Sequence, residues 1–120
     1  MSSAHARLCL VRAVDEPALG SAALQAMFTK CRAFLHLRGV EAAMPMFYDD
    51  DERRSGYLGE IIVPIHRAVD PAIETIVDAW FEGPAERAVR LRVGEMAAEA
   101  RGAAQVASFL RSAQALRQAP

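Results

Sequence analysis

One carboxylate stands out chemically in the sequence because it lies inside a run that is otherwise apolar. The run covers residues 57–65 and reads YLGEIIVPI, with Glu60 at its fourth position. Side chains alternate between the two faces of a strand, so Glu60 would share one face with Leu58 and Ile62. A carboxylate among apolar neighbours loses hydration unless it is paired or reached by water, and such groups are enriched at functional sites.

Glu60 has two interpretations that the residues leave equally open. It either faces a ligand, or it lies on a solvent-exposed face and pairs with an arginine across the sheet. Arg90 and Arg92 are suitable partners because both lie on the polar side of the alternating run 86–93.

Aromatic residues on either side of this run strengthen the ligand-binding interpretation. Tyr48 precedes a polar loop, Tyr57 follows it, and Trp80 with Phe81 ends the next segment. Rings around a carboxylate would bind a cationic, flat or apolar molecule through cation–π contact and ion pairing. We therefore predict a ligand site made by Glu60, Tyr48, Tyr57 and Trp80. Trp80 is equally suited to a place in the core.

The remaining polar groups favour structural roles. His5, His36 and His66 are far apart and match no zinc-ligand spacing. The sequence contains no phosphate loop, dinucleotide fingerprint or nucleophile elbow. The acidic run 49–52 lacks the spacing of an EF-hand and is offset by two arginines, so we interpret it as a solvated loop. We expect no catalytic residue, no bound metal and no cofactor.

Composition and the two cysteines narrow the class of protein further. The 120 residues are 52% hydrophobic and 24% charged with a net charge of −1, which predicts a single domain over 1–120 with no affinity for nucleic acid or membranes. Cys9 and Cys31 fall in apolar registers, and we expect two buried, reduced thiols. The sequence shows no signal peptide and no run of about 18 apolar residues. We therefore expect a cytoplasmic protein.

Hydrophobic spacing predicts the elements of the first half of the chain. Residues 7–14 are rich in Leu and Val and predict a strand, whereas 21–38 carry apolar residues at three- and four-residue spacing and predict a helix. Segments 42–48 and 57–65 flank the polar loop and predict a β-hairpin. Pro45 restricts the first strand of that hairpin to an edge or a bulge.

The second half predicts a similar arrangement. Residues 72–81 fit a helix or a strand equally well, and 86–93 alternate strictly between polar and apolar side chains, which predicts a half-buried strand. After Gly94, residues 96–116 predict an alanine-rich helix, which Gly102 weakens by up to about 1 kcal/mol. The resulting order, β-α-β-β followed by β-α, predicts an α+β fold with two helices on one face of an antiparallel sheet, as in a duplicated module.

Four segments together resemble the gyrase-inhibitor-like (GyrI-like) small-molecule-binding superfamily. The segments are FLHLRGV (34–40), PMFYDD (45–50), GEIIVPI (59–65) and RAVRLRVG (87–94). This superfamily includes the effector-binding domains of MerR-type and AraC-type transcription regulators. The resemblance implies two β-α-β-β modules side by side, with a ligand cleft between them and with Tyr48 and Glu60 at that cleft.

The sequence departs from the family pattern in its second module. The family continues into two further strands that often supply a pocket glutamate and tyrosine, whereas this sequence ends soon after the predicted second helix. The resemblance then implies either a reduced cleft or a sheet that a partner chain completes, as in a homodimer joined through an open sheet edge. The DNA-reading helices of the full-length regulators have no counterpart, so direct binding to nucleic acid is not expected.

Three functional hypotheses follow from these observations. The first is a ligand-binding or sensor domain for a small cationic or aromatic molecule. The second is a protein-interaction modulator or self-associating module without enzymatic activity. The third is a small ferredoxin-like enzyme, such as a hydrolase, that uses Glu60 as a general base.

Overall fold

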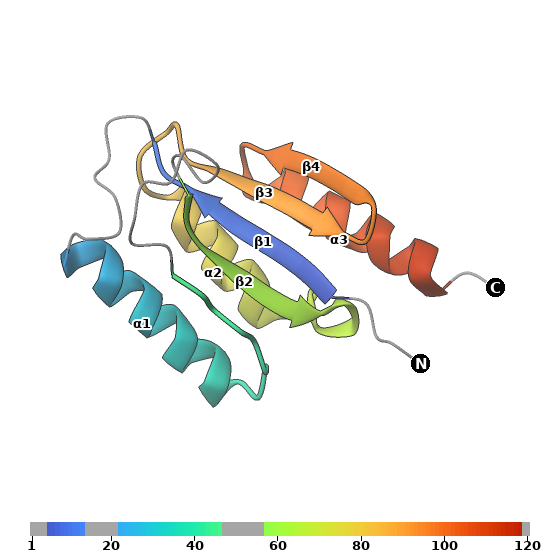
Figure 1. Ribbon diagram of the computed structural model, residues 1–120, viewed down its shortest axis with the longest axis horizontal. Coiled ribbons are helices and arrows are strands. Elements are labelled where there is room, and N and C mark those ends of the chain that lie inside the picture. Colours follow the sequence, from blue (N-terminus) through green and yellow to red (C-terminus); the bar gives the residue numbers. More distant parts are fainter. Residues whose placement is uncertain (1–4, 14–21, 47–56, 119–120) are drawn as a thin grey trace.

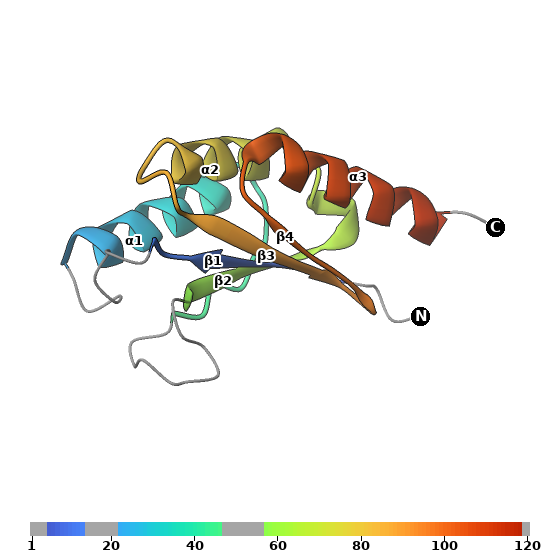
Figure 2. The same cartoon turned by 90° about the horizontal axis from the view of Figure 1, so that it is seen from above.

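The computed structural model describes residues 5–13, 22–46 and 57–118, which form a sheet covered on one face by helices (Figure 1). The strands are β1 (His5–Val11), β2 (Tyr57–Pro64), β3 (Ala88–Val93) and β4 (Met96–Ala100). The helices are α1 (Ala22–Leu37), the short 3-10 helix η2 (Ile65–Arg67), α2 (Pro71–Phe81) and α3 (Ala103–Gln118). Figure 2 shows α1, α2 and α3 on the same side of the sheet.

The four strands lie in the order β2-β1-β3-β4, and every neighbouring pair is antiparallel. In the middle of the sheet, Leu8 of β1 is paired with Ile61 of β2 on one side and with Leu91 of β3 on the other. The predicted α+β class and its antiparallel sheet are therefore confirmed.

The antiparallel pairing of the predicted hairpin is also confirmed for the described residues, but 43–46 pairs through two isolated bridges and is not a continuous strand. Ala43 pairs with Ile62 and Met46 pairs with Gly59 in antiparallel bridges. The Ile62 amide donates to the Ala43 carbonyl at 2.8 Å, and the Glu60 amide donates to the Pro45 carbonyl at 3.0 Å. The 43–46 segment therefore covers the outer edge of β2. Pro45 is compatible with this edge position because it supplies only a carbonyl there.

Alternation along the strands decides which side chains enter the core. Ala6, Leu8 and Leu10 of β1 point toward the helices, and their registered neighbours on β2 and β3 do the same. The helices contribute a matching apolar layer, made by Leu24, Phe28, Leu35, Ile73, Val77, Trp80, Val106 and Leu110. Burial of these side chains is the main source of the stability of the fold.

The segment that the sequence left open, 72–81, is helical. Asp70 lies at the N-cap of α2, where its side chain accepts a hydrogen bond from the Ala72 amide at 2.8 Å, and Pro71 occupies the first turn. Both residues are favoured at these positions. The helical period then buries Ile73 and Trp80 on the face of α2 that packs against the sheet.

The prediction of one long helix over 96–116 is wrong at its beginning. Met96–Ala100 is strand β4, joined to β3 by the two-residue turn Gly94-Glu95, and α3 begins only at Ala103. Gly94 has a φ of 59°, which fits the first central position of a type II′ hairpin turn. The alanines of this segment favour helix by propensity, but pairing with β3 overrides that preference. Within the described residues, the sheet therefore has four strands, and three α-helices cover it instead of the two that the sequence predicts.

This arrangement also changes the role of Gly102. It precedes α3 instead of interrupting it, and its carbonyl accepts a hydrogen bond from the Val106 amide. The expected weakening of a helix interior does not apply.

Packing around Gly59 makes one mutation a sensitive test of the fold. A Cβ added at Gly59 would lie 2.5 Å from Phe28 Cζ and 2.6 Å from the Pro45 carbonyl oxygen. Gly59→Ala should therefore lower the free energy of unfolding by about 1–3 kcal/mol, measured by urea denaturation. Gly102→Ala is the matched control, because a Cβ there meets nothing within 4 Å. Equal effects of the two substitutions would contradict the packing of β2 against α1.

Candidate functional site

Glu60 lies on the face of the sheet opposite the helices and forms an ion pair there. Its carboxylate is 3.6 Å from the guanidinium of Arg7 on the adjacent strand β1, and the two side chains are 20% and 52% exposed. The predicted cross-sheet pairing is therefore present, but with Arg7 as the observed partner instead of Arg90 or Arg92. Because the arginine is half exposed, solvent screens the pair and its contribution to stability is small.

The strand register places Glu60 at one end of a row that crosses the whole sheet. Glu60 is paired with Cys9, Cys9 with Arg90, and Arg90 with Glu99. At the far end of the row, Arg90 Nε lies 3.6 Å from a Glu99 carboxylate oxygen. The open face therefore carries charges of both signs on either side of one thiol.

The thiol in the centre of this row is chemically quiet. Cys9 is buried, and burial together with the neighbouring Glu60 carboxylate raises its pKa from 9.0 to about 12, with Arg90 acting in the opposite direction. Burial also raises the pKa of Cys31. Both cysteines are free, as expected, but the prediction of two buried thiols is wrong for Cys31, which is only partly buried. Because the thiolate is the nucleophilic form, neither side chain is poised for covalent catalysis.

Trp80 lies on the other side of the sheet from Glu60. It is only 2% exposed, and its indole N–H donates to the Ala88 carbonyl at 3.1 Å. The guanidinium of Arg87 stacks on the ring at 4.0 Å and donates to the Trp80 carbonyl. Trp80 is therefore a core residue whose indole N–H already has a hydrogen-bond acceptor and whose ring face is already covered by Arg87.

The four residues of the predicted ligand site are not all brought together. Glu60 and Trp80 are separated by the sheet, so one pocket cannot contain both side chains. Tyr57 opens β2, but its side chain lies outside the described residues, and so does the whole of Tyr48. A ligand-binding role for Glu60 or either tyrosine stays a prediction.

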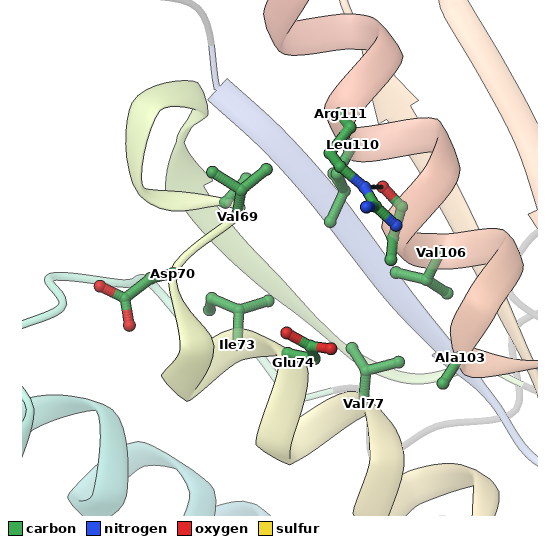
Figure 3. Close-up of a pocket in the computed structure, with 11 residues that line it drawn as sticks. Val69, Asp70, Ile73, Glu74, Val77, Ala103, Val106, Leu110 and Arg111 are labelled. Carbon is green, nitrogen blue, oxygen red and sulfur yellow. Dashed lines mark hydrogen bonds between the residues drawn. The ribbon is translucent and has the colours of Figure 1, made fainter.

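A groove that the sequence did not predict lies between α2 and α3 (Figure 3). Its volume is about 220 Å³. Ile73 and Val77 line it from α2, and Val106 and Leu110 line it from α3. All four side chains are buried, so the floor of the groove is apolar.

Charged residues stand at the mouth of this groove. Figure 3 shows the carboxylate of Glu74 beside Ile73 and Val77, on the side of α2 that faces α3. Across the groove, Arg111 Nε donates to the Ala107 carbonyl of its own helix at 3.3 Å. Asp70 also lines the groove, but its side chain caps α2 and lies 3.7 Å from Arg67. Glu74 is therefore the carboxylate best placed to meet a bound molecule.

Other classes of site find no support in the described part of the chain. Among residues 5–13, 22–46 and 57–118, no group of three or more His, Cys, Asp or Glu side chains is arranged to hold a metal ion. None of the helices in these ranges is long and apolar enough to cross a membrane.

Comparison with known proteins adds no further assignment. No protein-family model matches the chain, and searches of curated proteins and of solved structures find no match either. The resemblance to the GyrI-like superfamily therefore stays a prediction from the sequence.

There is a physical reason why the sequence does not predict this groove. The floor of the groove is made by two pairs of apolar residues four apart, Ile73 with Val77 and Val106 with Leu110. Any amphipathic helix contains such pairs. Only the placement of α3 beside α2 turns them into a concavity, and that placement depends on β4. Because the first residues of 96–116 were assigned to a helix, the position of α3 was not predicted.

The row on the open face generates a test of the electrostatics of Cys9. A pKa of about 12 instead of 9.0 leaves a thiolate population about 1000-fold smaller at pH 8, so Cys9 of a Cys31→Ala variant should react that much more slowly with iodoacetamide in the native state than in urea. Adding Glu60→Gln should speed the native reaction and Arg90→Gln should slow it. Equal native and denatured rates would contradict the burial of this thiol.

Proposed function

We propose that the protein binds a small organic molecule, with an apolar body and a cationic group, in the groove between α2 and α3. The observation that supports this proposal is the combination of an apolar floor with a carboxylate at the mouth (Figure 3). Ligand sites are concave and mainly apolar, and a few polar groups fix the orientation of the ligand. The proposal keeps the predicted ligand-binding or sensor role and moves the site from Glu60 to Glu74.

The apolar floor supplies the binding energy. The side chains of Ile73, Val77, Val106 and Leu110 form one surface between the two helices. An aromatic ring or short alkyl chain placed on it would leave water, which contributes about 25 cal/mol per Å² of apolar surface removed. The volume of about 220 Å³ is below the usual range of drug-sized pockets, so the ligand is a compact molecule such as an arylalkylamine.

The charges at the mouth favour a cation. Among the described residues, Asp70 and Glu74 line the groove together with one base, Arg111, so acidic groups outnumber basic ones there. The Asp70 carboxylate already caps α2, which leaves Glu74 to receive an ammonium group. Hydrogen bonds to charged groups contribute about 1.5–3 kcal/mol.

An enzymatic role for Glu60 has less support than a binding role. A general base must act beside a reacting group. Glu60 is in register with Cys9 of β1, and Cys9 is in register with Arg90 of β3. The thiol of Cys9 has a raised pKa and is protonated at neutral pH. The carboxylate of Glu60 also lies 3.6 Å from the guanidinium of Arg7, so it is already engaged in an ion pair.

The proposal predicts saturable binding of the phenethylammonium ion to the full chain. In a ¹H–¹⁵N NMR titration, the amide shifts should cluster on α2 and α3. Glu74→Gln should weaken binding about tenfold, because it removes the charge that receives the ammonium group. Ala107→Leu should abolish binding by filling the groove that Ala107 lines.

Ala115→Leu is the matched control for the filling variant. It makes the same substitution on the exposed side of α3, so it should bind the probe like the unmodified chain. Absence of saturable shifts would overturn the proposal. Equal affinities of Ala107→Leu and Ala115→Leu would do the same.

A further inference from the structure

We propose that a second copy of this chain pairs with the outer edge of β4, so that two sheets join into one continuous antiparallel sheet. β4 ends the strand order β2-β1-β3-β4, and no strand of the described ranges pairs with its far side. An unpaired strand edge presents a row of N–H and C=O groups to another chain. This interface is separate from the groove between α2 and α3.

β4 lacks two of the devices that block an edge, a proline and a β-bulge. Its five residues, MAAEA, contain no proline, and its pairing with β3 is regular from Met96 to Ala100 without a bulge. Ala97, Ala98 and Glu99 are exposed. The opposite edge of the sheet differs, because the 43–46 segment with its proline covers β2. β4 is therefore the edge open to addition of a strand.

The turn before β4 determines which backbone groups point outward. In a hairpin closed by a two-residue turn, the residues on either side of the turn exchange both of their hydrogen bonds. Met96 is therefore bonded to Val93, and the pattern repeats at every second residue along β4. The N–H and C=O groups of Ala97 and Glu99 then face away from β3, toward the incoming copy.

Charge selects one register for the two copies. Only Ala97 and Glu99 offer outward groups, so a two-fold axis has three choices: Ala97 opposite Ala97, Glu99 opposite Glu99, or Ala97 opposite Glu99. Pairing of Ala97 with Ala97 places Glu95 opposite Glu99 of the other copy. Pairing of Glu99 with Glu99 places two carboxylates directly opposite each other. Like charges in such positions are destabilising. The third places Glu95 opposite Arg101 of the second copy, twice.

The third register is thus the self-complementary one. It centres the two-fold axis at Ala98, where a small side chain permits close approach of the copies. An interface of this symmetry uses the same patch on both subunits, so each opposite-charge pair occurs twice. Arg101 also contacts Glu99 of its own strand at 3.0 Å, which holds its guanidinium close to the edge.

The helices support the same pairing. α3 packs against both β3 and β4, on the face of the sheet that also carries α1 and α2 (Figure 2). Joining two β4 strands about 4.8 Å apart would therefore place the two α3 helices on the same face of the joined sheet, on either side of the two-fold axis.

The flank of α3 that would meet its copy is partly apolar. Ala107 and Arg111 line the groove toward α2, and the helical period places Phe109 and Leu116 on the opposite flank. Leu116 is 65% exposed, and Phe109 is partly buried against the core. Contact between two α3 helices would cover Leu116 in each copy.

Charge exchange tests both the interface and its register. Sedimentation velocity on the full chain, from micromolar to submillimolar concentration, should show a species of twice 13.1 kDa. Glu95→Arg alone and Arg101→Glu alone should each raise the dimer dissociation constant about tenfold, because like charges then oppose each other. The double variant Glu95→Arg with Arg101→Glu should recover part of this loss. Recovery is incomplete because the glutamate introduced at position 101 also lies beside Glu99 of its own strand, where Arg101 forms an ion pair.

A backbone variant provides an independent measurement. Ala97→Pro removes an outward N–H that the fold does not use, so it should yield a folded monomer by circular dichroism and sedimentation. A species of 13.1 kDa at every concentration of the unmodified chain would overturn the proposal. A double charge variant that associates no better than either single variant would overturn the proposed register.

Discussion

The burial of every second residue of β1 constrains the rest of the structure. Ala6, Leu8 and Leu10 are at most 1% exposed beneath the helices, whereas Arg7 and Cys9 point to the other face. Because β2 and β3 pair with β1 on either side, their side chains must follow the same alternation. A register shift of one residue would expose the core row and bury the charged row, so the arrangement is strongly specified.

This division assigns different chemistry to the two faces. The covered face has an apolar layer, and a groove lies between α2 and α3 on that face. The open face has Glu60, Arg7, Arg90 and Glu99 in ion pairs around a thiol that burial keeps protonated. An apolar ligand is therefore better accommodated among the helices than on the strand that carries Glu60.

Side-chain alternation and helical spacing in the sequence predict most elements of the fold. The faces of 59–63 and 88–93, the first helix and the antiparallel hairpin follow from one-dimensional patterns. The predicted alternation fails at Leu58, where the pairing register shifts and the side chain is buried in the core. β4 was not predicted from these patterns, because its alanines favour a helix. The signal for this strand is the two-residue turn Gly94-Glu95, which pairs it with β3. Trp80 was ambiguous because its spacing suits a core helix and a pocket wall alike. The groove depends on tertiary placement of α3, which no local pattern contains.

The clamp that Arg87 forms on Trp80 also has an optical consequence. Trp80 is the only tryptophan of the chain, and the sheet, the Ala88 carbonyl and a guanidinium enclose its indole ring. A chromophore in such dry surroundings emits at short wavelength and is shielded from dissolved quenchers. The fluorescence of Trp80 therefore reports whether α2 remains packed against β3, and it can be used to follow unfolding of the core without an added label.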